Sequence, residues 1–200
     1  MLKAVSNDAL ETIDRLPLAF HFAWSDTKAR YRRSLLGPMW LVLTTAIGVA
    51  GLGFLWSTLF KVDKAVFVPS LTVGIVVWQL ISGCIIEGST IFVRQANIIR
   101  NIKTPYIIFP IYLLIRQLIN FTHNLVIVVL VLIIFPPASM GVQQLLLIPG
   151  LFLLVGNLFW VVTLIGLLSA RFRDLEQFIV AIMPLLFSES GHLSPGATWH

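Results

Sequence analysis

Residues 39–60, MWLVLTTAIGVAGLGFLWSTLF, decide the fold class of this protein. They belong to a run of 27 positions, from Ser34 to Phe60, that holds no charged residue. A soluble core helix alternates apolar and polar faces, and this run shows no polar face. Because about 20 consecutive apolar residues are enough for a helix to cross the hydrocarbon core of a bilayer, residues 39–60 predict a membrane span.

The rest of the chain repeats this pattern. Ala65–Ile86 holds 22 positions without charge, and the 54 positions between Arg116 and Arg171 contain His123 as their only ionisable side chain. Overall, 58% of residues are hydrophobic and 12% are charged, against about 45–50% and about 25% in soluble domains. We therefore predict an all-α, polytopic membrane protein with four clear spans, at 39–60, at 66–86, within 107–135 and at 145–169. A fifth apolar run, 178–187, is only 10 residues long and is too short to cross.

Residues 1–38 form an amphipathic N-terminal segment ahead of a transmembrane domain at 39–187. Apolar residues recur in it at three- and four-residue spacing, which places them on one helical face: Leu10, Ile13, Leu16, Phe20 and Trp24. Pro17 is expected to divide the segment into two short helices. Such a segment lies in the headgroup plane of a membrane, or it is a solvated extension that packs on a partner, and the sequence favours neither.

Basic residues predict the orientation. Twelve of the 14 Lys and Arg residues fall before span one, between spans two and three, or after span four, and two fall on the other side. Since loops rich in Lys and Arg stay in the cytoplasm, the N-terminus is expected to be cytoplasmic. The same placement beside apolar runs explains the net charge of +5 without nucleic acid as a partner.

Motifs for catalysis are absent from the sequence. No Lys follows a Gly, which excludes a GxxxxGK[ST] phosphate loop, and neither HExxH, CxxC nor GxSxG occurs. Cys84 is the single cysteine and the four histidines are scattered, so we predict no metal site and no cofactor. These observations favour a protein that is not an enzyme.

One polar group lies at membrane depth, on the third span. Its members recur at i, i+4, i+7 and i+8 and therefore share a helical face: Arg116, Asn120, His123 and Asn124. Polar side chains inside a span face protein or water, so these residues are candidates for the lining of a transport pathway. In the alternative interpretation, Arg116 reaches the interface and the Asn and His side chains bond neighbouring helices. Glu87 is expected to pair with Arg94 or to contact a partner.

Three segments carry a resemblance to a known family: KARYRRSLLGPMW at 28–40, RQANIIRNIKTPYIIFPIY at 94–112 and ARFRDLEQ at 170–177. They resemble, in order and spacing, the type-2 ABC exporter permeases that move O-antigen, capsule or teichoic-acid polymers. The resemblance covers residues from about 8 to 187. In that family a short cytoplasmic coupling helix between spans two and three docks on a separate ATPase subunit.

The resemblance implies a homodimeric permease in the bacterial inner membrane, with two copies of a cytoplasmic ABC ATPase as partners and a lipid-linked polysaccharide as substrate. ATP hydrolysis would take place on the ATPase. The residues implied to dock on it are those of the coupling helix: Arg94, Asn97, Ile98, Arg100, Asn101 and Lys103. Trp56 and Trp78 are either contacts for sugar rings or ordinary interfacial anchors.

The sequence departs from the family pattern near its end. The family continues through a complete fifth span and a sixth, whereas here MPLLF at 183–187 gives way to the polar tail SESGHLSPGATWH at 188–200. This change predicts a truncated or frameshifted reading frame, with an extension in a shortened relative as the alternative. Other open interpretations are an exporter permease for a drug or another small hydrophobic substrate, a membrane-embedded enzyme, and a truncated protein without transport activity.

Overall fold

Long apolar helices make up most of the computed structural model, which describes residues 15–32, 34, 36–61, 63–101, 105–136 and 146–189. The helices within these residues are α2 (Leu16–Tyr31), α3 (Met39–Phe60), α4 (Lys64–Arg94), α5 (Ala96–Asn101), α6 (Ile108–Ile134), α7 (Leu147–Arg171) and α8 (Asp174–Glu189). Four of them, α3, α4, α6 and α7, are long and apolar enough to cross a membrane. The predicted all-α polytopic fold with four spans is confirmed for the described residues.

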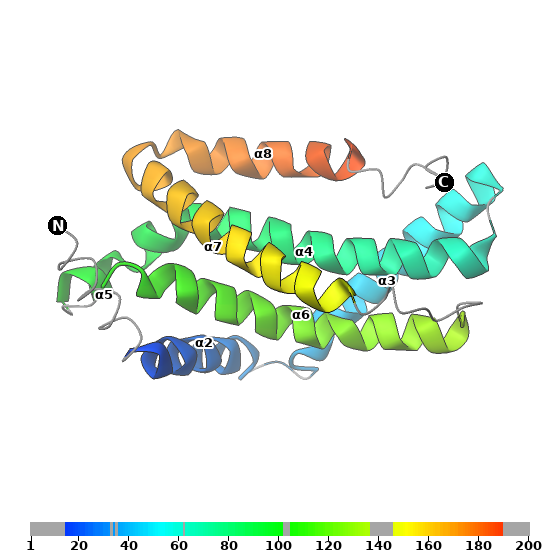
Figure 1. The fold of residues 1–200 in the computed structure, drawn as a ribbon, viewed down its shortest axis with the longest axis horizontal. Helices are drawn as coiled ribbons and strands as arrows, with labels where there is room; N and C mark the ends of the chain where they lie inside the picture. Colours follow the sequence, from blue (N-terminus) through cyan, green and yellow to red (C-terminus); the bar gives the residue numbers. More distant parts are fainter. Residues whose placement is uncertain are drawn as a thin grey trace.

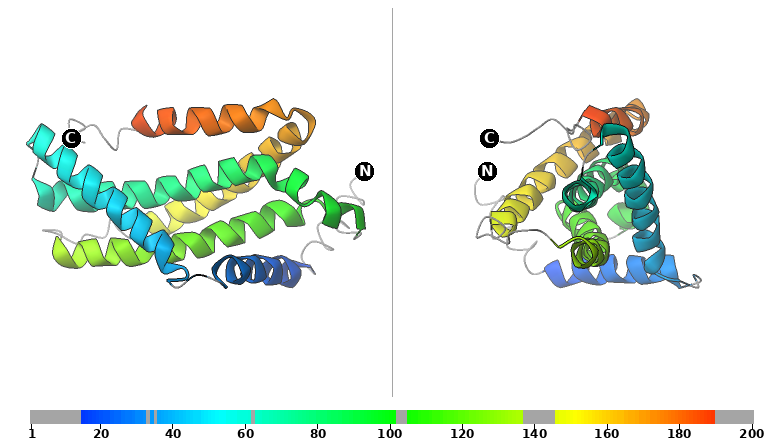
Figure 2. Two further views of the ribbon diagram at one scale, coloured as in Figure 1. Left: turned by 180° about the vertical axis from the view of Figure 1, so that it is seen from behind. Right: turned by 90° about the vertical axis from the view of Figure 1, so that its right-hand side faces the viewer.

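Helix α4 is the central element of the bundle. It packs against α3, α6, α7 and α8, and α6 in turn carries α2. Figure 1 shows α4 and α6 side by side along the long axis, with α7 crossing them diagonally. Figure 2 shows α3 crossing on the opposite side and α2 lying across the end of α6 rather than along it. The core is therefore formed by α4 and α6, and the outer helices expose their large apolar side chains, such as Phe152 on α7, which is 80% exposed.

Backbone geometry sets the two ends of α3. Gly37 takes a φ of 54°, in the left-handed region that glycine adopts readily, and Pro38 follows at the start of the helix. At the other end Lys61 takes a φ of 52° and terminates the helix. Asp63 then accepts a hydrogen bond from the backbone N–H of Ala65 at 3.0 Å and caps α4. The predicted limits of span one, 39–60, are confirmed.

Helix α4 extends beyond its predicted limits. The prediction ended span two at Ile86, whereas the helix continues to Arg94 and has 31 residues, or about 46 Å at 1.5 Å per residue. It continues because Gly88, Ser89 and Thr90 are buried, and the two hydroxyls bond carbonyl groups of the same helix. Of the predicted coupling helix after it, Ala96–Asn101 is helical, Arg94 is the last residue of α4, and residues 102–104 lie outside the described part of the chain.

Small residues bring α4 and α7 close together. A Cβ atom at Gly166 would lie 3.0 Å from the carbonyl oxygen of Gly88 and 2.9 Å from the ring of Phe92. In a membrane, where lipid is as apolar as a leucine side chain, such close backbone approach is a main source of helix association. The glycines thus place α7 on the face of α4 away from α3.

Helix α2, which precedes α3, packs against the transmembrane bundle of the same chain. Helix α2 begins at Leu16 with Pro17 in its first turn, where proline is tolerated, and the residues before Arg15 lie outside the described part of the chain. The apolar stripe of the prediction, Leu16, Phe20 and Trp24, does share a face, but that face is exposed. Helix α2 instead packs on α6 through its buried small side chains, which are Ala19, Ala23 and Thr27.

Helix α8 contains the fifth apolar run. It has 16 residues and starts four positions before Phe178, with Asp174 and Glu176 in its first turn, where acidic side chains favour a helix N-terminus. It packs on α4, and the ring of Phe187 lies 5.6 Å from that of Trp78. Of the predicted polar tail, residues 190–200 lie outside the described part of the chain.

Candidate functional site

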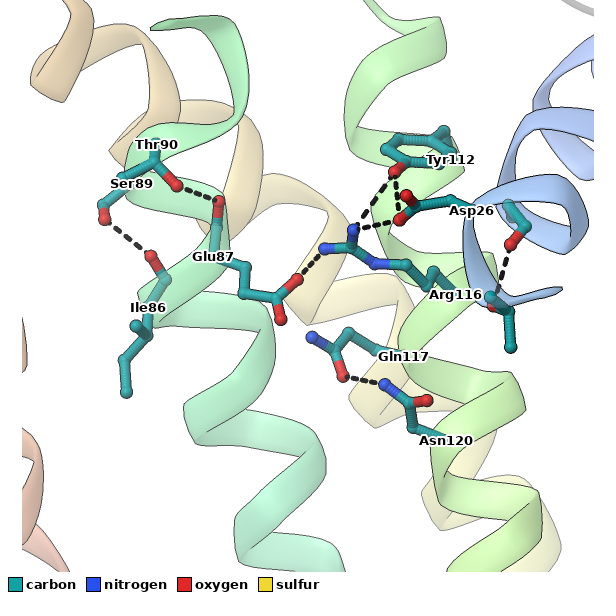
Figure 3. A network of polar contacts seen from close by, with 11 residues as sticks. Asp26, Ile86, Glu87, Ser89, Thr90, Tyr112, Arg116, Gln117 and Asn120 are labelled. Atoms are coloured by element: carbon teal, nitrogen blue, oxygen red, sulfur yellow. Dashed lines mark hydrogen bonds and ion pairs between the residues drawn. The ribbon is translucent and has the colours of Figure 1, made fainter. Parts of the chain in front are cut away.

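Arg116 is the centre of a buried charge network at one end of the bundle. One terminal nitrogen of its guanidinium, Nη1, donates to Oδ2 of Asp26 at 2.6 Å, and the other, Nη2, forms an ion pair with Glu87. The hydroxyl of Tyr112 donates to the same Asp26 oxygen at 2.9 Å. The side chain of Arg116 is only 8% exposed. Figure 3 shows the guanidinium between the two carboxylates, so one cation joins α2, α4 and α6. We call Asp26, Glu87 and Arg116 the charged triad.

Electrostatics favour the ionised form of Asp26, which lies outside the spans. Partial burial tends to raise the pKa of this carboxyl, but hydrogen bonds from Arg116 and Tyr112 and the charges of Arg116 and Arg30 outweigh burial. The pKa of Asp26 therefore lies below its usual value. A carboxylate thus remains available to Arg116 throughout the neutral pH range.

Glu87 does not pair with Arg94, which was one of its expected partners. Because α4 remains helical between them, the two residues are separated by a rise of about 10 Å. Glu87 faces α6 and meets Arg116, while Arg94 is exposed at the end of α4. The ion pair thus forms between helices rather than along one.

A second polar cluster lies deeper in the bundle. The amide of Asn124 donates to Gln79 at 2.8 Å, the amide of Gln79 donates to the hydroxyl of Thr45 at 3.2 Å, and that hydroxyl lies 3.0 Å from Asn124 Oδ1. These contacts join the three side chains in a ring between α3, α4 and α6, and the hydroxyl of Thr45 also lies 3.0 Å from the carbonyl oxygen of Leu41 in its own helix. We call Thr45, Gln79 and Asn124 the neutral cluster. Thr45 and Asn124 are buried, at 2% and 3% exposure.

The other two candidate pathway residues bond within α6. Asn120 donates to Gln117 at 3.2 Å, and Nδ1 of His123 lies 2.7 Å from the carbonyl oxygen of Ile119, so this nitrogen carries the proton. Both side chains are partly exposed. Of the four residues predicted on one face, Asn124 bonds other helices, as the alternative interpretation expected, whereas Asn120 and His123 bond within α6. Arg116 also bonds other helices, although that interpretation expected it to reach the interface.

A cavity of about 350 Å³ lies between α3, α4 and α8. The wall formed by α3 and α4 carries four polar side chains, Thr44, Thr45, Gln79 and Ser82, beside apolar ones such as Leu52 and Ile75, and we call these four the polar wall. The facing wall is apolar and belongs to α8, with Met183, Pro184 and Phe187. Two of these polar side chains, Thr45 and Gln79, are held in place by Asn124 of α6, which bonds both of them and is not part of the cavity lining. Trp78 lines the same cavity, whereas Trp56 is not among its lining residues.

Helix α5 extends beyond the end of α4 and exposes a polar face. Arg94, Asn97, Arg100 and Asn101 are exposed, whereas Ile98 is partly buried and packs towards the core. Most of the described docking candidates therefore face outward, whereas Ile98 faces the core and anchors α5 to it. Lys103 lies outside the described residues.

Within the described residues, no three side chains of His, Cys, Asp and Glu gather in a way that could hold a metal ion. Cys84 is buried between the helices as a free thiol.

The sequence matches the family described as ABC-2 type transporter over residues 18–198. This match covers most of the chain. The chain belongs to the ABC-2 type transporter family. Proteins of this family are membrane subunits of transporters, and the four apolar helices agree with a multi-pass membrane protein.

The sequence is also distantly related to one characterised transport protein. The chain is 25% identical over 171 residues to the O-antigen export system permease protein RfbA of Klebsiella pneumoniae. The aligned region covers 81% of this chain and 62% of RfbA, so the chain spans less than two thirds of that relative.

Proposed function

We propose that this chain is the membrane-spanning permease subunit of an ABC exporter that carries lipid-linked polysaccharide across the bacterial inner membrane. The family match carries the transporter assignment, and the name of the relative RfbA supports a glycan as the cargo. ATP hydrolysis would take place on a separate cytoplasmic ATPase subunit, and a second copy of the permease would complete the pathway.

The exposed face of α5 supports the position of the ATPase. Arg100 carries positive charge on this face, Arg94 adds another at the adjoining end of α4, and Ile98 anchors the helix to the core. A short helix held in this way transmits force from a docked partner to α4, because Gln95 alone separates the two helices. In this proposal α5 is the coupling helix, its end of the bundle is cytoplasmic, and the partner surface is acidic.

The cavity between α3, α4 and α8 supports a hydroxylated cargo. Hydroxyl and amide groups on one wall can bond sugar hydroxyls, and the indole of Trp78 offers an apolar face to a sugar ring. The polar side chains of this wall already bond groups of the protein, so a small hydrophobic substrate would leave none of them unsatisfied, but it would also gain no hydrogen bond from them. The polar wall therefore favours the polysaccharide over the alternative substrate, and we propose this wall, rather than Arg116, as part of the pathway.

A pull-down from detergent-solubilised membranes tests the assignment, with the candidate ABC ATPase subunit as bait. Arg100→Glu should abolish or strongly reduce recovery, because it reverses a charge on the exposed face of α5. Lys61→Glu is the matched control, since it makes the same charge change at an exposed site between α3 and α4. Equal recovery of both variants would place the docking surface elsewhere, and no recovery of the unaltered chain would contradict the exporter assignment.

A second measurement tests the cargo. The permease and its ATPase are reconstituted in liposomes, and ATP hydrolysis is followed with lipid-linked glycan or with a hydrophobic cationic drug. Stimulation by the glycan that is lost in Gln79→Leu supports the polysaccharide. Stimulation by the drug alone would favour the alternative substrate.

A further inference from the structure

The two carboxylates of the charged triad differ in their surroundings. The side chain of Asp26 is 43% exposed and that of Glu87 is 23% exposed. Asp26 also lines a cavity of about 270 Å³ between α2, α5 and α6. Figure 3 shows Asp26 reaching Arg116 from α2, while Glu87 approaches from α4 on the opposite side. The network thus has one arm beside open space and one arm inside the bundle.

This difference decides which arm opens at lower cost. If Asp26 withdraws, its carboxylate can be hydrated in the adjoining cavity, and Arg116 keeps Glu87 as a partner. If Glu87 withdrew, a carboxylate between two spans would lose its cation, which is costly at membrane depth. A shared arginine therefore allows α2 to detach without leaving a buried charge unpaired.

The remaining contact of α2 with the bundle is made mostly by small side chains. Its buried side chains are Ala19, Ala23 and Thr27, which bury little apolar area compared with Leu or Phe, and Phe22 packs against the core while partly exposed. The hydroxyl of Thr27 bonds the carbonyl of Ala23 in its own helix and adds no link to α6. Asp26, by contrast, joins α2 to α6 directly, because it accepts hydrogen bonds from Tyr112 and Arg116.

We propose that the charged triad is a switchable link, in which α2 is released by opening the Asp26–Arg116 arm while the Arg116–Glu87 arm stays closed. The cavity beside Asp26 is bordered by α5 through Gln95 and Ile98, so movement of α5 changes the space next to the arm that opens. This last step, the cause of the movement, rests on the proposed docking of an ATPase on α5. The unequal arms are a property of the chain alone.

Site-specific labelling of the full-length permease tests the link. In a Cys84→Ala background, Ala23→Cys places a thiol on the buried face of α2, where it reacts with maleimide only when α2 detaches. Phe20→Cys on the exposed face is the matched control and should react at the same rate in every variant. Thermal unfolding of each variant in detergent shows that it is folded before its labelling is compared.

The two carboxylate variants are expected to act in opposite directions. Asp26→Asn should raise the labelling rate of Cys at position 23 by about fivefold, the upper range for one partly exposed ion pair. Glu87→Gln should lower it, because Arg116 then has Asp26 as its one anionic partner in the triad. General loosening of the bundle would raise the rate in both variants, and that result, or no change in either, would overturn the proposal.

A second labelling experiment tests whether ATPase binding controls the Asp26–Arg116 arm. With the ATPase and a non-hydrolysable ATP analogue bound, labelling at position 23 should change in the parent chain and stay constant in the Asp26→Asn variant. If the ATPase binds and changes the labelling at position 23 equally in the parent chain and in the Asp26→Asn variant, the charged triad does not couple the ATPase to α2. If the ATPase does not bind, the proposed function fails, and the opposite effects of the two carboxylate variants still decide the link by themselves.

Discussion

The charged triad and the neutral cluster occupy equivalent places on the same two helices. Glu87 and Gln79 are eight residues apart on α4, and their partners Arg116 and Asn124 are eight residues apart on α6. The helices run antiparallel, so each polar residue meets its partner at the same level, and the two sites are about 12 Å apart along the bundle. Each site also recruits one further helix, α2 through Asp26 or α3 through Thr45.

The difference between the sites lies in charge and access. The triad has two carboxylates for one cation and a half-exposed arm, whereas each group of the neutral cluster is bonded inside the bundle. Opening the neutral cluster leaves the amide groups of Gln79 and Asn124 without their partners, although the hydroxyl of Thr45 can still donate to the carbonyl oxygen of Leu41. The comparison teaches that α3 is held to the core as a fixed element, while α2 is held by a contact that can be exchanged.

The largest expected effect comes from removing the shared cation. Arg116→Leu leaves two carboxylates without their partner, and we expect the free energy of unfolding to fall by about 3–5 kcal/mol. The measurement is denaturant unfolding in detergent, with intrinsic Trp fluorescence as the signal. Arg100→Leu, at an exposed site on α5, should change it by less than about 0.5 kcal/mol.

A double variant separates charge from packing at this site. Glu87→Leu combined with Arg116→Leu removes the buried ion pair and leaves Asp26 with access to water. Since apolar residues often replace a buried pair without loss, the double variant should be more stable than Arg116→Leu alone. If the two losses simply add, Glu87 and Arg116 do not act as a pair.

The architecture could be predicted from hydropathy, whereas the links between helices could not. Runs without charge predicted the ends of α3, α6 and α7 to within two residues. They did so because a charged side chain is costly in lipid, so charged residues are rare in these spans. The end of α4 was missed because Gly88, Ser89 and Thr90 are polar or small in sequence but buried against neighbours in the structure. Hydropathy describes lipid contact, and these residues contact protein.

The polar sites show the same division. Arg116 and Asn124 were found from their spacing on one face, but Asp26 was missed because it lies in an amphipathic segment where an acid is ordinary. A usable signal existed on the other helix: Gln79 and Glu87 interrupt an apolar run eight residues apart, like Asn124 and Arg116. The third partner of each site depends on how α2 and α3 cross the pair, which no local pattern contains.

The neutral cluster should give a smaller effect than the triad. Asn124→Leu or Gln79→Leu removes one member and leaves the others unsatisfied, and we expect a loss of about 1–2 kcal/mol, measured by the same unfolding. Thr58→Val is the control, because Thr58 is exposed on α3 and bonds only its own helix. The double variant should lose less than the sum of the two single losses. Full additivity would mean that the ring contributes no coupling between α4 and α6.

The smallest effect concerns pH, and it distinguishes the charged site from the neutral one. Because the pKa of Asp26 is lowered in the folded chain, its contribution is complete above the unfolded value, about 3.9, and is lost as pH falls through the folded value. The stability difference between the parent chain and Asp26→Asn should therefore stay constant from pH 8 to pH 5 and narrow only below about pH 4. For Asn124→Leu the corresponding difference should not narrow there, since no group of the neutral cluster titrates. A difference for Asp26→Asn that already narrows between pH 8 and pH 6 would show that Arg116 does not hold this carboxylate, and the link between α2 and the spans would then need another explanation.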